Sequence, residues 1–141
     1  MTTEVEERSN AIEECYEFML AYAAQGLPTH QDSQSGGRLR EFLIRAARAL
    51  PALAESFAVA VKMEGLDQPE RYQGFLEVID RDARNSLGAI EMVLAQPAIS
   101  SQLIDNLNAS IHLRALLTDL FLIGEVFRAH RRSAELQSPG L

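Results

Sequence analysis

The 141-residue chain has no tryptophan and only one cysteine, and aromatic residues make up 6% of it. Its core must therefore be mostly aliphatic. The single Cys15 cannot form an internal disulfide, which suits a reducing compartment, and it falls on an apolar helical stripe where a thiol packs as a small hydrophobe. The first residues, Thr2 to Glu7, are acidic where a secretion signal carries positive charge. The longest apolar run, about Leu120 to Ile123, is far shorter than the roughly 20 residues that cross a bilayer. We therefore expect a cytoplasmic protein without a membrane span.

Basic residues are also scarce. Thirteen Lys and Arg stand against 20 Asp and Glu, for a net charge of -7, which argues against general nucleic-acid binding. The charge is uneven, because residues 4–17 are rich in Glu and residues 38–48 are rich in Arg. Cross-helix ion pairs are expected if these two segments pack together. Length and composition predict one helical-bundle domain over residues 1–132, and residues 133–141, which lack an apolar stripe, are expected to be a flexible C-terminal tail.

No segment shows the period-two alternation of a strand, so we predict an all-α fold. Apolar residues at helical spacing indicate four long helices, and the short connections between the later ones favour a four-helix up-down bundle. A polar segment rich in Ser, Gln and Gly is predicted to be a surface loop between the first two helices. The predicted helices cover about residues 3–25, 38–64, 67–96 and 101–132, with the loop at 28–37.

Local signals mark several helix ends. Thr3 followed by Glu6 matches a capping box, and Ser100 or the serine after it suits the start of the fourth helix. Asp67, with a proline two residues later, is expected to open the third helix. Pro51 lies inside the second helix, where it lacks a backbone donor and clashes with the preceding turn. The second helix is therefore expected to be kinked near residues 47–51 or broken there.

The last predicted helix is the most informative segment, because its apolar residues cover two different sides. One helix therefore needs partners on two sides, so it lies at the bundle centre, forms an interface, or lines a ligand pocket. The first face consists of Leu103, Ile104, Leu107 and Ile111. The second face supplies the interface or pocket candidates, which are Leu113, Leu116, Leu117, Leu120, Ile123 and Phe127.

Metal and cofactor signals are missing from the sequence. A bundle di-iron site needs Glu-x-x-His motifs, and no histidine here has Glu three residues before it; c-type haem needs Cys-x-x-Cys-His. We therefore expect no cofactor, no metal and no catalytic residue. The acidic group of Glu77, Asp80 and Asp82 is interpreted as a solvated face, since Arg81 and Arg84 stand four residues after two of its members.

The stretch from His112 to Leu116 resembles in part the phospho-accepting segment of histidine phosphotransfer domains, which are four-helix bundles with an exposed mid-helix histidine. Arg114 would be the basic helper in such a module. Leu116 departs from the pattern, because it stands where those domains have a small residue. The simpler interpretation of His112 is a partly exposed side chain hydrogen-bonded to Asn108 or Asp105.

Taken together, these features favour a non-enzymatic interaction or accessory protein. A second copy is the most economical partner, because twofold dimers are the commonest oligomers, and another protein is the other option. The alternative is a small-molecule-binding bundle, in which the same leucines line a pocket for a lipid-like or aromatic ligand. The substitution Leu120→Glu distinguishes an interface position from a core position. It is expected to give a folded monomer at an interface, and a collapsed or aggregated protein in the core.

Overall fold

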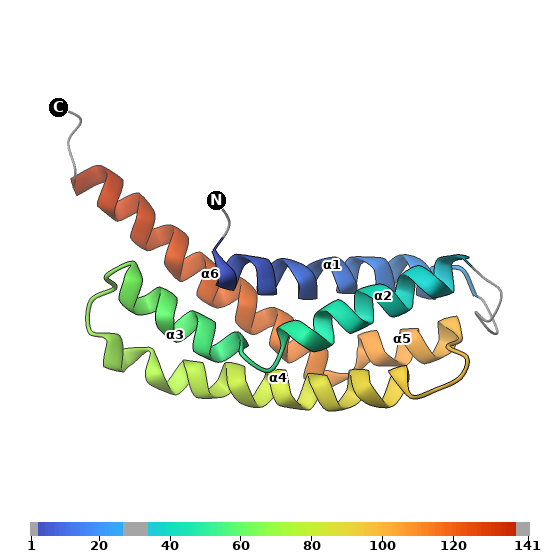
Figure 1. The fold of residues 1–141 in the computed structure, drawn as a ribbon. Coiled ribbons are helices and arrows are strands. Elements are labelled where there is room, and N and C mark those ends of the chain that lie inside the picture. Colours follow the sequence, from blue (N-terminus) through green and yellow to red (C-terminus); the bar gives the residue numbers. More distant parts are fainter. Residues whose placement is uncertain (1–2, 27–33, 138–141) are drawn as a thin grey trace.

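The computed structural model describes residues 3–26 and 34–137, and in these residues helices are joined by turns with no strand. This confirms the all-α prediction. Four helices were predicted, but the described chain contains six α-helices and one short 3-10 helix, η1 (Figure 1). Their bounds are α1 Glu4–Ala24, α2 Gln34–Ala49, α3 Leu53–Met63, η1 Pro69–Arg71, α4 Gln73–Leu94, α5 Ser101–Ala109 and α6 Ile111–Gln137.

Figure 1 shows an elongated arrangement in which α1 lies along α2, and α4 lies along the opposite side with α3 above it. The closely packed pairs are α1 with α2 and α5, and α4 with α6 and α3. The chain runs out along α1, back along α2 and α3, out along α4, and back along α5 and α6. The last turns of α6 project beyond the other helices, and the residues from 131 to 136 are exposed.

Helix α1 begins and packs as its sequence predicts. The Thr3 hydroxyl accepts a 3.2 Å hydrogen bond from the Glu6 backbone N–H, which satisfies one donor of the first turn. Cys15 is buried, with its sulfur 3.7 Å from that of Met19. Burial raises the pKa of the Cys15 thiol to about 12, against a smaller opposing effect of the Arg45 charge. The thiol is therefore an unreactive core group.

The segment predicted as a second helix is two helices, α2 and α3, separated by residues 50–52 around Pro51. The last regular bond of α2 runs from the Leu50 N–H to the Ala46 carbonyl, and Pro51 has no N–H to continue the ladder. Helix α2 starts at Gln34, so residues 34–37 of the predicted loop are helical, and its residues 28–33 lie outside the described chain.

In the connection from α3 to α4, the end of α3 agrees with the sequence prediction and the start of α4 does not. Helix α3 ends where predicted, with Gly65 at a φ of 68° and the Leu66 N–H bonded to the Val61 carbonyl at 3.2 Å. The prediction that Asp67 opens the third helix is wrong. Gln68 has a φ of 54°, which interrupts the helix, and α4 starts only at Gln73 without a side-chain cap.

The last predicted helix is also two helices, because the chain breaks at Ser110. Ser110 is extended, with a φ of -63° and a ψ of 140°. Ser100 caps α5 through a 3.1 Å bond from the Leu103 N–H, as predicted. The break explains the two apolar faces of this segment. The first face lies on α5 except for Ile111, which begins α6 and is exposed, and the second face lies wholly on α6.

The core is one cluster of aliphatic side chains with a few rings, as expected from the low aromatic content. The tail predicted at residues 133–141 begins inside α6, which continues to Gln137, while residues 138–141 lie outside the described chain. In the described residues, no helix is long and apolar enough to cross a membrane.

Candidate functional site

The six interface or pocket candidates of the last helix all lie on α6 and are all 5% exposed or less within a single chain. They therefore centre the fold. The sequence allowed three roles for these residues, in the core, at an interface or in a ligand pocket. Their burial favours the core. Two of them, Leu120 and Phe127, also form the floor of a cavity.

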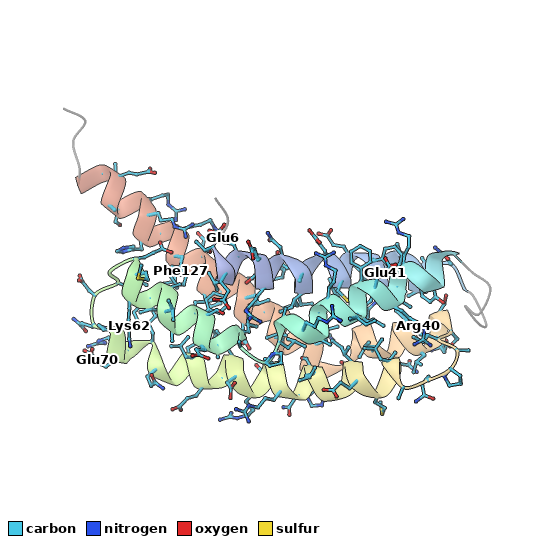
Figure 2. The ribbon with its side chains drawn as sticks, viewed as in Figure 1. Glu6, Arg40, Glu41, Lys62, Glu70 and Phe127 are labelled. Carbon is cyan, nitrogen blue, oxygen red and sulfur yellow. The ribbon has the colours of Figure 1, made fainter. Side chains whose placement is uncertain are left out.

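This α1–α6 cavity has a volume of about 200 Å³ and lies between the first half of α1, helix α3 and helix α6. Its apolar lining comprises Val5, Phe57, Leu120, Phe121 and Phe127, of which all but Phe121 are buried. The rings of Phe57 and Phe127 lie 6.2 Å apart at a 33° tilt. Phe127 is labelled in Figure 2, near Glu6 of the opposing helix α1.

Glycine 124 keeps the α6 side of the cavity open. A Cβ built on Gly124 meets nothing closer than the Arg128 guanidinium at 3.5 Å, which is ordinary van der Waals contact. The opposite wall carries the small polar side chains of Ser9 and Asn10 on α1. A glycine facing two short polar side chains leaves room where two packed helices would otherwise interdigitate.

Charged side chains of both signs surround the cavity. Arg131 makes two hydrogen bonds to the Glu64 carboxylate, at 2.9 and 2.8 Å, and lies 3.9 Å from Glu6. Arg128 binds Glu125 at 3.0 and 3.1 Å. Hydrogen bonds from Arg128, and then from Arg132, hold the pKa of Glu125 below its usual range. Arg128, Arg131 and Arg132 of α6 therefore all have carboxylate partners within the protein.

Glu13 also lines the cavity, and it differs from the other rim carboxylates. Burial raises the pKa of Glu13, the neighbouring Glu17 raises it further, and the charge of Arg128 opposes both. Within the described residues, no basic side chain lies at ion-pair distance from Glu13. Glu13 is thus a half-buried carboxylate at a mixed apolar and charged opening.

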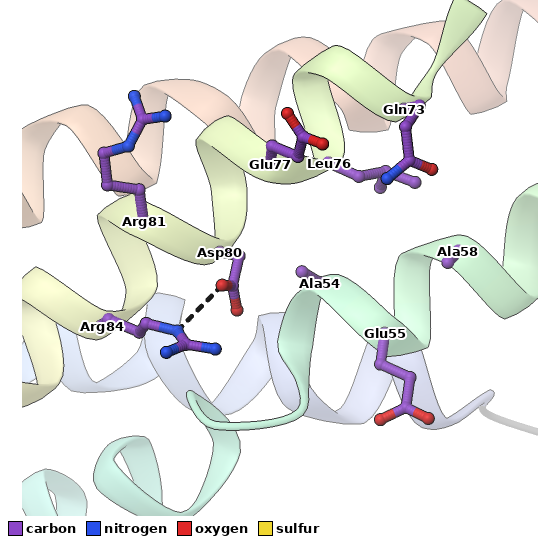
Figure 3. A pocket seen from close by; sticks show the side chains of 9 residues that line it. All are labelled: Ala54, Glu55, Ala58, Gln73, Leu76, Glu77, Asp80, Arg81 and Arg84. Atoms are coloured by element: carbon purple, nitrogen blue, oxygen red, sulfur yellow. Dashed lines mark ion pairs between the residues drawn. The ribbon is translucent and has the colours of Figure 1, made fainter. Parts of the chain in front are cut away.

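A second hollow, the α3–α4 groove, is larger at about 640 Å³ (Figure 3). Its floor is made by the small side chains of Ala54 and Ala58 together with Leu76. Charged side chains form its sides, including the predicted ion pair of Asp80 with Arg84 at 2.8 Å. The Arg84 side chain is 76% exposed, so this groove is an open, solvated seam between helices.

The prediction that Asp82 lies on a solvated face is wrong. Asp82 is half-buried and faces Asp119 of α6, which is 8% exposed. Burial raises the pKa of Asp119 to about 7, together with a hydrogen bond that protonated Asp119 donates to Asp82 and the negative charge of Asp82. Two residues from helices distant in sequence form this carboxyl pair, so no spacing motif could reveal it. Neither the α1–α6 cavity nor the α3–α4 groove reaches it, and we assign it a structural role.

His112 and Arg114, the phosphotransfer candidates, are both exposed on the first turn of α6. The break at Ser110 places Asp105 and Asn108 on α5 instead of on the helix of His112. The Asn108 side-chain amide has no hydrogen-bond partner in the described structure, so it does not bind His112. Among the described residues, no cluster of three or more His, Cys, Asp or Glu side chains is arranged to hold a metal ion.

The chain was compared with protein-family models, curated proteins and solved structures, and none of them matches it.

Proposed function

We propose that this protein is a non-enzymatic binding protein that holds a compact aromatic or apolar molecule in the α1–α6 cavity. The observation that carries the proposal is the lining of this cavity by three phenylalanine rings and Leu120. An apolar protein cavity of about 150 Å³ is large enough to bind benzene. A cavity of about 200 Å³ therefore suits a single substituted ring. Small-molecule sites combine apolar surface with polar groups that orient the ligand. Here five apolar side chains line the cavity beside seven polar or charged ones.

Filling the cavity tests this proposal. Gly124→Leu places a branched side chain at the cavity wall. A folded protein is expected, because a Cβ at this position makes only ordinary van der Waals contact with the flexible Arg128 side chain. Gly88→Leu is the matched control, since Gly88 is an exposed helical glycine of α4 with nothing within 4 Å of a built Cβ. Ligand-observed NMR with 2-phenylethanol, a neutral aromatic probe, measures binding, and circular dichroism checks the fold.

The wild type and Gly88→Leu are expected to bind the probe, and Gly124→Leu is expected to lose binding at least tenfold, because its side chain occupies the ring site. Equal binding by the two leucine variants would place the probe elsewhere and overturn the proposal. Absence of binding by the wild type would also overturn it.

A second candidate function is self-association through α6, favoured by two large apolar side chains that the single chain leaves open to solvent. Phe121 is 61% exposed and the adjacent Leu122 is 55% exposed. In this proposal the homodimer contact uses these exposed residues, with the six buried candidates supporting the helix from inside. Native mass spectrometry is expected to show a dimer for the wild type and for Met92→Glu, a change of an exposed α4 residue, and a monomer for Leu122→Glu. A monomeric wild type would refute self-association.

We further propose that the helices form an up-down bundle of four rods, with α2–α3 and α5–α6 each serving as one rod. The alternating chain directions in Figure 1 support this arrangement.

We also propose a cytoplasmic location, supported by the single, buried and reduced Cys15. Cell fractionation tests the location.

A further inference from the structure

The rim of the α1–α6 cavity carries an excess of negative charge, which bears on the kind of ring it would hold. Three carboxylates line it, Glu6, Glu13 and Glu64, against two guanidinium groups, Arg128 and Arg131. The whole chain carries a net charge of -7. Both the rim and the surrounding molecule therefore favour a cation over an anion.

The two arginines offer little to an anionic ligand, because both are already bound to carboxylates. Both Glu64 oxygens take a hydrogen bond from Arg131, at 2.9 and 2.8 Å. A single Glu125 oxygen accepts two bonds from Arg128, at 3.1 and 3.0 Å. An anion would have to displace one of these carboxylates, at the cost of charge-assisted hydrogen bonds.

Glu13 is in the opposite situation. It lines the cavity, is half-buried, and has no basic side chain at ion-pair distance in the part of the chain described here. Burial and the charge of Glu17 disfavour its ionised form. A bound cation would stabilise that form. The rings of Phe57, Phe121 and Phe127 add three aromatic groups, whose faces also attract cations.

We propose that the cavity recognises a compact aromatic amine, with the ring packed on Leu120, Phe57 and Phe127 and the ammonium group donating hydrogen bonds to the Glu13 carboxylate. This inference rests on the proposed binding function and adds the chemical class of the ligand. The size of the cavity commits the site to a small molecule, since about 200 Å³ holds one ring and a short chain.

Three probes that share a phenyl ring and differ in charge test the inference at neutral pH: 2-phenylethylamine, 2-phenylethanol and phenylacetate. Isothermal titration calorimetry or ligand-observed NMR gives the three dissociation constants. The amine is expected to bind roughly tenfold more tightly than the alcohol, as one charge-assisted hydrogen bond at a half-exposed site suggests. Phenylacetate is expected to bind most weakly, because carboxylates predominate at the rim.

The residue assignment is tested with Glu13→Gln, which keeps the side-chain size and removes the charge. This variant is expected to bind the amine and the alcohol equally, with its affinity for the alcohol within about twofold of the wild type. Glu17→Gln is the matched control, since Glu17 lies one turn further along α1, is exposed and does not line the cavity. It is expected to keep the preference for the amine.

The outcomes separate this inference from the binding function on which it rests. If none of the three probes binds, the proposed function fails. If the alcohol binds as tightly as the amine, the cavity is a ring site without cation recognition, and the inference alone is overturned. Tightest binding of phenylacetate would assign recognition to the arginines and overturn it as well. A preference for the amine that survives Glu13→Gln would overturn the role of Glu13.

Discussion

Asp119 lies in an environment that disfavours an ionised carboxylate. A carboxyl group that is 8% exposed and faces a second carboxyl, Asp82, is stabilised when the pair holds a proton. Below neutral pH one proton joins the two helices α4 and α6 at this point. Above it, two negative charges face each other in a partly buried seam.

This arrangement predicts that the stability of the protein falls as pH rises. The pKa of Asp119 is about 7 in the folded chain, above its ordinary value of 3.8, so the folded state holds more protons between these values. The contribution of the pair to stability is full below about pH 4 and is lost as the pH rises through 7. Asp119→Asn is expected to flatten this dependence and to raise the free energy of unfolding at pH 8 by roughly 1 to 2 kcal/mol relative to the wild type.

Urea unfolding at pH 5 and pH 8 measures the effect. Asp105→Asn is the control, because Asp105 is an exposed residue of α5, and this variant is expected to follow the wild type at both values. A difference between Asp119→Asn and the wild type that is the same at both pH values would show that the pair does not titrate in this range.

At the scale of helices, two arginine side chains bind the carbonyl ends of helices distant in sequence. Arg8 of α1 donates to the carbonyl of Ala49 at 3.0 Å and to that of Arg48 at 3.3 Å, at the end of α2. Arg40 of α2 donates to the Leu94 carbonyl at 3.1 Å, at the end of α4 (Figure 2 labels Arg40). The last carbonyls of a helix have no partner in the helix and carry partial negative charge, so these cations suit them.

The predicted attraction between the Glu-rich first helix and the Arg-rich second helix also has a structural counterpart. Arg45 pairs with Glu14 across the α1–α2 seam at 3.1 Å. Both side chains are about half exposed, so this pair contributes at most about 1 kcal/mol. Its main effect is on which helices pair.

We expect Arg8→Met to lower the free energy of unfolding by about 1 to 2 kcal/mol. Methionine keeps the apolar stem but removes the charged donors, which leaves the end of α2 without its side-chain partner. Chemical denaturation monitored by circular dichroism measures the loss. Arg48→Met is the control, since the Arg48 side chain is exposed and has no hydrogen bond or ion pair in the described structure. Equal losses for the two variants would show that the cap does not stabilise the fold.

At the scale of the molecule, the arrangement of helices leaves α1 and α6 apart over the segment where the cavity lies. Helix α1 packs closely on α2 and α5, and α6 packs closely on α4. Phe57 of α3, together with Phe121 and Phe127 of α6, lines this space. The cavity thus depends on the tertiary structure, since its lining comes from helices α1, α3 and α6, which are far apart in the sequence.

The burial of the α6 leucines predicts how the Leu120→Glu variant, which distinguishes a core position from an interface position, will behave. Leu120→Glu is expected to lower the free energy of unfolding by more than about 3 kcal/mol, because it places an unpaired charge where the side chain is 4% exposed. Such a loss is large against the total stability of a small domain. Size-exclusion chromatography and circular dichroism are expected to show an unfolded or aggregated protein.

Leu122→Glu, two residues further along α6, is the control, because Leu122 is 55% exposed and its replacement should leave the fold intact. A folded monomeric Leu120→Glu protein would instead place Leu120 at an interface between chains.

The sequence by itself determined the helical class and those helix ends that depend on neighbouring residues. Thr3, Ser100 and Gly65 act on backbone groups within a few residues of themselves, so their types and positions suffice to predict them. The six apolar candidates on the second face of the last segment are buried, whereas Ile111 of its first face is exposed. In each case the cause is local backbone chemistry or the burial of an apolar stripe.

Tertiary structure decided the remaining features, because each depends on residues that only the packing brings together. The chain breaks at Ser110 because α5 packs on α1 while α6 packs on α4. The segment that was predicted to be one helix with two apolar faces is therefore two helices. The Asp82–Asp119 pair, the Arg8 cap and the α1–α6 cavity each join helices far apart in the chain. Periodicity reports which face of a helix is buried, but it carries no information about which other helix covers that face.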